Sequence, residues 1–392
     1  MQGDRLQQLI ANLCPQGVPY KRVRDVYKRL KGTPITASKM KEISTPNGEI
    51  RVFAGGKTAI NAHKSDIPTA NIIYRPAVLV QSRGIIDVIY YNKPFTFKNE
   101  MWAYYADDQV STKFLFYILK NNIQTFREAA SGMGSLPQIS LSVTEDFLIP
   151  VPPLEIQQEI VRILDHFTEL TAELTAELTA ELTARKEQYI YYRNRLLAPT
   201  SQSTWMTLGD IGKVAMCKRI MKAETSPSGD VPFYKIGTFG KEPDAYISKA
   251  KYEEYRSKYS FPKKGDILIS AAGTIGRTVI YDGEPAYYQD SNIVWVENDE
   301  SIVLNRYLYY YYQLQPWSVS TGGTIARLYN DNISKARISV PPLPEQRRIV
   351  SILDRFDALC NDLTSGLPAE IAARQKQYEY YRDKLLTFKE RV

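Results

Sequence analysis

The sequence predicts an α+β protein in which two domains of short strands and helices alternate with two long helices. Two observations lead to this prediction. A segment of almost fifty residues occurs twice in the chain, and its first copy contains no Pro or Gly after its opening prolines. The remaining blocks consist of short apolar or β-branched runs bounded by Gly, Pro and Asn, a pattern typical of strands.

The repeat aligns residues 151–197 with residues 340–386 without a gap, at an offset of 189, with 26 of 47 positions identical. Both copies open Val-Pro-Pro-Leu and close Tyr-Tyr-Arg-x-x-Leu-Leu. Because proline presets the backbone for a helix start, each copy predicts a short entry followed by one long helix. Gly366 and Pro368 lie inside the second copy, where we expect a kink or a break.

The repeat divides the chain into four parts. These are a first variable block (residues 1–150), a central conserved helix (151–199), a second variable block (200–339) and a C-terminal conserved helix (340–392). We expect strands at residues 71–74, 77–81, 85–91, 266–270, 278–281 and 293–296, and helices at residues 112–125 and 305–315. The two blocks therefore look like α+β domains of one ancestry.

Charge, apolar runs and the spacing of cysteines and histidines limit the classes of function that this chain can have. The 392 residues include 50 Lys and Arg against 43 Asp and Glu, a net charge of +7 that suits a polyanionic partner. No run approaches 18 apolar residues and the first thirty residues lack the apolar stretch of a signal peptide, so we expect a cytoplasmic protein. Cys14, Cys217, Cys360 and the two histidines have no metal-ligand spacing, so we expect no metal site and no disulfide framework.

Three perfect Thr-Ala-Glu-Leu tetrads occupy residues 171–182 of the central helix. On a helix, leucines four residues apart drift by about 40° per step and form a slowly spiralling stripe. We expect this stripe to pack against an aligned row in the second copy, unless the helix is a solvated spacer that packs on nothing. The two rows are Leu170, Leu174, Leu178 and Leu182, and Leu359, Leu363 and Leu367. One tetrad adds about 6 Å, close to two base pairs of DNA.

This layout, with VPPLxxQ at residues 151–157 and 340–346 and ILDxF at 163–167 and 352–356, resembles the DNA-specificity subunit of type I restriction–modification enzymes. The resemblance covers essentially the whole chain, and the tetrads resemble the spacer repeats of one subfamily. It implies two target-recognition domains, each reading one half of a split DNA sequence. It also implies that the long helices pair as an antiparallel coiled coil with pseudo-two-fold symmetry, set the spacing and dock two modification (methyltransferase) subunits. Restriction subunits, which act as translocase and nuclease, would join that core.

The resemblance further implies that this chain is non-catalytic, and that S-adenosylmethionine is bound by the partner methyltransferase subunit, which modifies adenine. The residues agree, because no NPPF or DPPY motif is present and the Gly-Lys of residues 55–58 lacks the earlier glycine of a phosphate loop. Two alternatives stay open: a coiled-coil DNA-architectural or scaffold protein without methyltransferase partners, and a self-sufficient nuclease.

Candidate DNA contacts are basic side chains near glycine-rich turns, since phosphates supply affinity and base edges supply specificity. The alternative for the basic run at residues 21–31 is a solvated face, and for the glycine-rich loops at 131–134 and 320–323 a simple sharp turn. In the first block we expect contacts from Lys21, Arg22, Arg24, Lys28, Arg29, Arg51, Lys57, Arg83, Ser135 and Gln138. In the second block we expect them from Lys218, Arg219, Lys235, Thr274, Arg277, Thr324 and Arg327. Arg suits guanine and Gln suits adenine.

Overall fold

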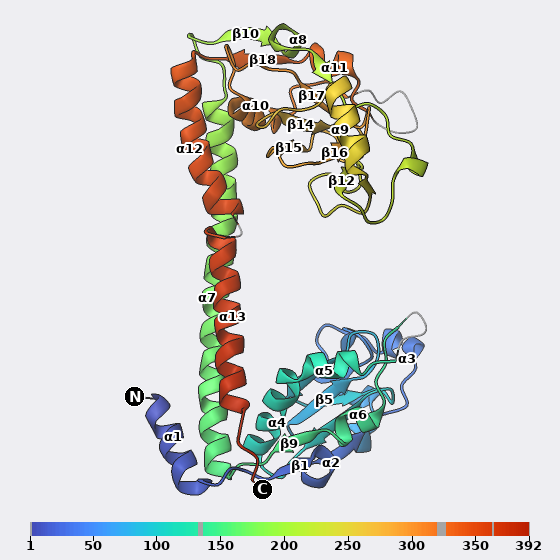
Figure 1. The fold of residues 1–392 in the computed structure, drawn as a ribbon. Helices are drawn as coiled ribbons and strands as arrows, with labels where there is room; N and C mark the ends of the chain where they lie inside the picture. Colours follow the sequence, from blue (N-terminus) through green and yellow to red (C-terminus); the bar gives the residue numbers. More distant parts are fainter. Residues whose placement is uncertain (1, 132–135, 320–326, 363, 392) are drawn as a thin grey trace. The chain divides into compact units, whose positions relative to one another are not determined.

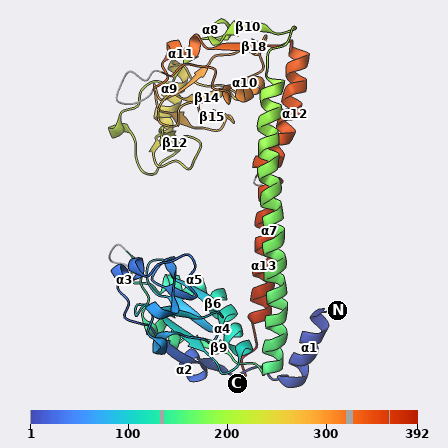
Figure 2. The same ribbon diagram turned by 180° about the vertical axis from the view of Figure 1, so that it is seen from behind.

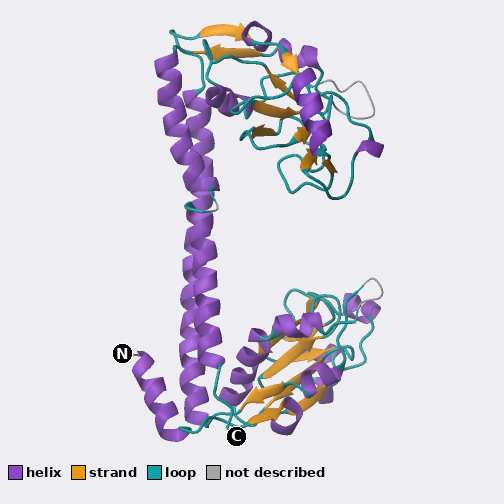
Figure 3. Cartoon of the chain, viewed as in Figure 1, coloured by secondary structure: helices purple, strands orange, loops and turns teal. Residues whose placement is uncertain are grey.

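The computed structural model describes residues 2–131, 136–319, 327–362 and 364–391. The chain forms two compact units, of which unit 1 comprises Met1–Glu177 and Ile371–Val392 and unit 2 comprises Leu178–Glu370. Each unit contains a domain of strands and short helices and a part of the long helices, as the colouring by secondary structure shows (Figure 3). The predicted α+β class with two long helical regions is confirmed.

The domain of unit 1 contains two small sheets (Figure 1). In the first, all neighbours are antiparallel, and the order is β2 (Lys28–Lys31), β8 (Trp102–Tyr105), β5 (Ala77–Gln81) and β6 (Asp87–Tyr91). In the second, the order is β4 (Ala59–Ala62), β3 (Ile50–Phe53) and β7 (Phe95–Phe97), with β3 and β7 parallel. Its helices are α1 (Gln2–Leu13), α2 (Val23–Val26), α3 (Ala37–Glu42), η1 (Lys64–Asp66), η2 (Thr69–Asn71), α4 (Gln109–Asn121), α5 (Ile123–Glu128) and α6 (Leu141–Glu145).

The domain of unit 2 repeats this topology strand for strand. Its four-stranded sheet has the order β11 (Val214–Ala215), β17 (Ile293–Val296), β14 (Ile267–Ser270) and β15 (Thr278–Ile280). Its three-stranded sheet has the order β13 (Tyr246–Ile247), β12 (Val231–Tyr234) and β16 (Tyr287–Tyr288), again with one parallel pair. Its helices are α8 (Leu208–Ile211), η3 (Lys222–Glu224), α9 (Lys249–Lys258), α10 (Asn305–Tyr312) and α11 (Asn330–Ser334). The same strand order and directions support a common ancestry of the two domains.

Each domain is closed by a pair of antiparallel strands where the chain enters and leaves it. These pairs are β1 (Tyr20–Arg22) with β9 (Leu148–Pro150), and β10 (Thr204–Thr207) with β18 (Arg337–Val340). In unit 2 a long helix that ends at Leu196 precedes β10 in the chain. In unit 1 the residues that follow the last long helix, near the C-terminus, lie beside the segment that leads into β1. Val18 pairs with Glu390, and the Tyr20 hydroxyl donates to the Phe388 carbonyl at 3.1 Å. Residues 18–20 and 388–390 thus lie side by side inside unit 1.

The long helices are α7 (Leu154–Leu196), α12 (Leu343–Asn361) and α13 (Leu367–Leu386). In unit 1 the first half of α7 lies beside α13, where the rings of Phe167 and Tyr381 are 6.1 Å apart. In unit 2 the second half of α7 lies beside α12, where Tyr192 stacks on Phe356 at 5.7 Å. Figures 1 and 2 show each half of α7 beside its partner from opposite sides. In both pairs the two helices run in opposite directions. The predicted antiparallel pairing of the long helices is therefore confirmed.

The helix of the second repeat is broken, as Gly366 and Pro368 predict. α12 ends at Asn361 and α13 begins at Leu367. Between them, the Asp362 carboxylate accepts a hydrogen bond from the Thr364 backbone N–H at 2.7 Å. A Cβ at Gly366 would lie 2.5 Å from the Ala358 carbonyl oxygen, so this close approach requires glycine.

The same contact attaches each domain to its long helix. In unit 1, Lys113 Nζ and the Tyr117 hydroxyl donate to Asp165 at 2.7 and 2.5 Å. In unit 2, Arg306 Nε and the Tyr310 hydroxyl donate to Asp354 at 2.7 and 2.5 Å. Asp165 and Asp354 are aligned positions of the sequence repeat. The repeated segments therefore carry the attachment points of domains whose other residues differ.

Two sequence expectations need correction. Residues 71–74 are not a strand, because a 3₁₀ turn occupies Thr69–Asn71 and only Ile73 forms a bridge, with Phe95. Leu170 and Leu174 line a groove with Arg374, Gln377 and Tyr378 of α13 rather than with the predicted leucine row, since the helices run antiparallel. Leu170 stays 46% exposed, Leu178 and Leu182 are half-buried, and Leu363 lies outside the described residues.

A buried glutamine at the start of α12 carries more bonds than its aligned partner in α7. Gln346 is fully buried, donates to the Pro341 and Ile302 carbonyls at 2.7 and 2.9 Å and accepts from the Leu304 N–H at 2.9 Å. Gln157 donates to the Pro152 carbonyl at 2.8 Å, and its side-chain oxygen has no partner among the described residues. Gln346 and Gln157 thus occupy aligned positions, but the side chain of Gln346 makes three of these hydrogen bonds and that of Gln157 makes one.

We expect Gln346→Leu to lower the free energy of unfolding by about 2 kcal/mol or more, because it leaves buried backbone groups without partners. Gln157→Leu removes one bond and one unsatisfied oxygen and should cost clearly less. Chemical denaturation of the two variants checks this. Equal losses would contradict the structural assignment.

Candidate nucleic-acid interface

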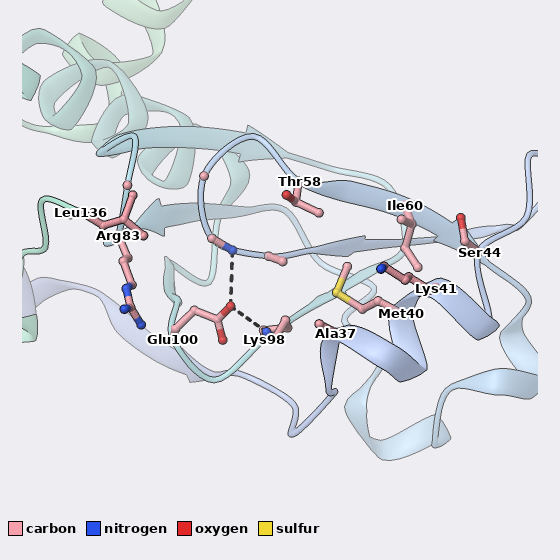
Figure 4. A pocket seen from close by; sticks show the side chains of 14 residues that line it. Ala37, Met40, Lys41, Ser44, Thr58, Ile60, Arg83, Lys98, Glu100 and Leu136 are labelled. Atoms are coloured by element: carbon pink, nitrogen blue, oxygen red, sulfur yellow. Dashed lines mark hydrogen bonds and ion pairs between the residues drawn. The ribbon is translucent and has the colours of Figure 1, made fainter.

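The first candidate site is a pocket of about 790 Å³ in the domain of unit 1. Figure 4 shows Arg83, Glu100 and Leu136 towards one side of it and Met40, Lys41 and Ile60 towards the other. The connection between β3 and β4, α3 with its following residues, and the segment after β7 form its walls. Its lining residues are Ala37, Met40, Lys41, Ser44, Ala54, Gly55, Gly56, Thr58, Ile60, Arg83, Gly84, Lys98, Glu100 and Leu136.

Backbone contacts bring three predicted DNA-binding residues to one edge of this pocket. The Gly56 N–H donates to the Arg83 carbonyl at 3.1 Å, which places Lys57 beside Arg83. Arg83 also forms a β-bridge with Gln138. The side chains of Lys57, Arg83 and Gln138 are all exposed. Ser135, another predicted contact of the first block, lies outside the described residues.

One carboxylate lies among the cations of the first pocket. Glu100 accepts hydrogen bonds from Lys98 Nζ at 3.1 Å and from the Gly55 N–H at 3.4 Å. Burial by itself would raise the pKa of Glu100, but its hydrogen bonds to backbone N–H groups and Lys98 outweigh burial and hold the pKa below its ordinary value. The Glu100 carboxylate is therefore ionised at neutral pH and pairs with Lys98. Lys41 and Arg83 are the other two cations in the lining.

The second candidate site is a pocket of about 590 Å³ at the equivalent place in unit 2. Both pockets are lined by the segment that precedes the central strand of the three-stranded sheet, by that strand's following connection, and by the segment after its parallel neighbour. The lining residues here are Arg219, Ile220, Lys222, Thr225, Ser226, Pro227, Phe233, Lys235, Asp244, Ala245, Gln289, Asp290, Ser291, Asn292 and Arg327. Three predicted DNA-binding residues, Arg219, Lys235 and Arg327, therefore meet in one pocket.

Each of these three cations is held by an oxygen of the pocket. Arg219 Nε donates to Asp290 Oδ2 at 2.9 Å, and Lys235 Nζ lies 2.8 Å from Asp244 Oδ1. Arg327 Nη2 donates to the Ser291 carbonyl at 2.7 Å. With Lys222, four cationic side chains line the pocket against two carboxylates, so a positive excess remains for an anionic partner.

The basic run at residues 21–31 does not line either pocket. The run spans β1, α2 and β2. Four of its cations pair with carboxylates of the same domain. Arg22 and Arg24 lie 3.5 and 2.8 Å from Asp146. Arg29 lies 3.0 Å from Glu145, Lys28 lies 2.7 Å from Asp107, and Lys21 is exposed on β1. None of these residues lines the first pocket, and their DNA contacts stay predictions.

Four further predicted residues are not among those that line the pockets. Arg51 donates to Asn61 Oδ1 at 2.8 Å within the three-stranded sheet. Arg277 donates to the Phe239 carbonyl at 3.0 Å, next to Thr274 in the turn between β14 and β15. Lys218 Nζ lies 5.2 Å from the centre of the Tyr259 ring. Thr324 lies outside the described residues, and none of these placements tests contact with DNA.

Sequence reasoning missed several lining residues. It did not single out the lysines Lys41, Lys98 and Lys222, because isolated lysines are common on any surface. It also missed Glu100, Asp290 and Ser291, since acidic and neutral residues carry no signal for a polyanion partner. Only the fold brings them beside the predicted cations.

Other kinds of site find no support in the part of the chain that the structure describes. Within it, no group of three or more His, Cys, Asp or Glu side chains is placed to hold a metal ion. The three cysteines are buried thiols, and burial raises the pKa of Cys217 to about 12. No described helix is both long enough and apolar enough to cross a membrane.

A duplicated α+β chain with an equivalent basic pocket in each half defines a class of bipartite nucleic-acid recognition proteins. The comparison of sequences identifies the class more closely. The chain belongs to the family described as type I restriction modification DNA specificity domain, which matches residues 15–184 and 202–373. The two matches correspond to the two halves of the duplication.

Two relatives in sequence are named as specificity subunits of type I restriction enzymes. S.HindORF215P of Haemophilus influenzae, named as a type I restriction enzyme specificity subunit, is 54% identical over 299 residues, which cover 75% of this chain and 77% of that protein. The EcoR124I/EcoR124II specificity subunit of Escherichia coli is 34% identical over 302 residues, 72% of each chain.

Solved structures share the fold at low sequence identity. A chain from the structure of type I restriction–modification complex assembly and conformational transition has a TM-score of 0.61 at 18% identity, covering 94% of this chain and 97% of that one. The HsdS subunit of Thermoanaerobacter tengcongensis has a TM-score of 0.51 at 16% identity, covering 96% and 99%. At this identity the likeness concerns the fold alone.

Proposed function

We propose that this chain is the sequence-reading subunit of a type I restriction–modification complex, and that each domain reads one half of a split DNA target. One observation carries the proposal: the two domains share one topology and place a cation-lined pocket at the same position, but line it with different residues. Equivalent pockets of different chemistry fit the reading of two different half-sites in duplex DNA.

The chain supplies recognition and its partners supply chemistry. We infer that two methyltransferase subunits dock on the duplicated helical regions, because unit 1 and unit 2 repeat the same helix pairing and the same domain attachment. S-adenosylmethionine binds to those subunits, with adenine as the modified base, and restriction subunits complete the complex. The location is the cytoplasm, where the DNA target is accessible.

The helical regions set the spacing between the half-sites. α7 contributes its first half to unit 1 and its second half to unit 2, so the number of residues in its tetrad segment determines the length of the connection. A helix of fixed rise per residue is a suitable spacer, because it resists compression far better than a flexible loop.

The experiment is to express the full chain with a methyltransferase subunit encoded beside it and to map the methylated bases in the host DNA. We expect one split motif, with two specified halves separated by unspecified bases. Methylation without a split motif, or with a single specified half, would contradict the proposal.

Two arms address the alternative functions. A scaffold or DNA-architectural protein without methyltransferase partners would fail to co-purify with the methyltransferase subunit. A self-sufficient nuclease would cut plasmid DNA when the purified chain is incubated alone with Mg²⁺. We expect co-purification in the first arm and intact plasmid in the second.

A further inference from the structure

The second pocket holds two arginines on one turn, the segment of residues 289–292 that follows β16. Asp290 accepts from Nε of Arg219 at 2.9 Å, and the carbonyl of the next residue, Ser291, accepts from Nη2 of Arg327 at 2.7 Å. Adjacent residues of one turn thus hold two guanidinium groups that belong to segments more than one hundred residues apart in the chain.

This turn is held firmly in an uncommon conformation. Ser291 has a φ of +60°, a region that residues other than glycine adopt rarely and at a cost in energy. The Asn292 carbonyl accepts from the Ala271 N–H at 2.7 Å, and Gln289 Oε1 accepts from the Ile236 N–H at 3.0 Å. Bonds to both neighbouring segments therefore fix the turn, and with it the two acceptor oxygens that hold the arginines.

The geometry at Arg219 leaves its recognition face open. Its side chain is 66% exposed, whereas that of Asp290 is 14% exposed. The bond to Asp290 uses Nε, and within the described residues no bond uses the two terminal nitrogens. A guanidinium held in this way presents two parallel N–H donors, the pattern that matches O6 and N7 of guanine in the major groove.

A contact to phosphate alone would not need this arrangement. Phosphate binding depends mainly on positive charge, which a neighbouring carboxylate reduces. Orientation of a guanidinium matters when two donors must meet two acceptors of a base edge, and holding the group beforehand lowers the entropy lost on binding. Asp290 therefore favours base reading over phosphate binding by Arg219.

We propose that Arg219 and Arg327, oriented by the turn of residues 289–292, each recognise a guanine in the half-site read by unit 2, with Asp290 as a positioning residue. The proposal rests on the proposed function and names the bases that one of its two readers selects. Among the residues lining the first pocket Arg83 is the one arginine, and it is bonded through its backbone carbonyl, so the arrangement belongs to the second reader.

The test is substitution of each arginine by lysine in the full complex, followed by mapping of methylated bases. Lysine keeps the positive charge for a phosphate but cannot present the paired donors. We expect Arg219→Lys and Arg327→Lys each to lower the preference for guanine about 10-fold or more at one position of one half-site, with the other half-site unchanged. Arg337→Lys, on β18 and against the Trp205 ring, is the matched control and should leave the motif intact.

Asp290→Asn tests the positioning role separately. We expect it to weaken guanine preference at the Arg219 position while affinity for unrelated DNA stays the same or rises, because a negative charge is removed. A structural role alone would lower the melting temperature and leave base preference unchanged.

The outcomes separate the two levels of the proposal. If the wild-type complex yields no split motif, the proposed function fails. If the split motif is present but both lysine variants keep it at every position, or if one half-site is not altered selectively, the assignment of guanine to these arginines is wrong while the proposed function stands.

Discussion

Removing one Thr-Ala-Glu-Leu tetrad from α7 is expected to shorten the spacer of the methylated motif by about one or two base pairs. The deletion of residues 171–174 takes about 6 Å from the helix and turns its C-terminal part by about 40°. This rotation is small, so the residues on the two sides of the deletion stay close to their original positions around the helix axis. The deletion of any of the three tetrads gives the same polypeptide, so the result concerns length alone.

The break between α12 and α13 allows the second repeat to adjust to a shorter α7. α12 ends at Asn361 and α13 begins at Leu367, and the Asp362 carboxylate accepts a hydrogen bond from the Thr364 N–H between them. We expect the contacts between Phe167 and Tyr381, and between Tyr192 and Phe356, to persist while this break adjusts. The control is the double substitution Glu173→Gln and Glu177→Gln, which changes the charge of the tetrads and keeps their number. An unchanged spacer in the deletion variant would refute the role of α7 as a ruler.

Arg327→Ala is expected to weaken recognition of one half-site by about 10-fold or more and to leave the other half-site's contacts largely intact. Arg327 lies in the second pocket, donates to the Ser291 carbonyl and lies 6.0 Å from the centre of the Tyr329 ring. Its removal takes away both the charge and the paired donors of the guanidinium. Footprinting of the full complex on its own target measures protection of each half separately.

The aligned residue of unit 1 offers the reciprocal test. Gln138 occupies the position of Arg327 in the repeat and lies beside Arg83 at the first pocket. Gln138→Ala should therefore affect the opposite half-site. Arg337→Ala, which removes one positive charge as Arg327→Ala does but on β18, should affect neither half-site. Loss of both halves together in either pocket variant, or of neither, would count against the assignment of one domain to each half.

The sequence alone was sufficient for the repeat, the α+β class and the break in the second helix. These features are local: prolines preset a helix start, glycine and proline interrupt a helix, and β-branched runs form strands. The predicted strands at residues 77–81 and 293–296 coincide with β5 and β17. Residues 71–74 were misjudged because a short apolar run says little about which backbone it can pair with.

The tertiary structure alone decided which predicted cations act together. Arg219, Lys235 and Arg327 are distant in sequence and meet only because β12, β16 and the segment before α11 converge on one pocket. It also decided what the first leucines of the stripe face, since the antiparallel direction places Leu170 and Leu174 near Arg374 rather than beside the aligned leucine row.

Local signals determined the elements of this protein and their duplication, because backbone preferences and periodicity act over a few residues. The composition of each pocket depends on contacts between residues far apart in the chain, whose free energy is realised only when the sheets form. Identity of the helical repeats was thus readable from the residues, whereas the turn that orients two arginines became visible only in the folded chain.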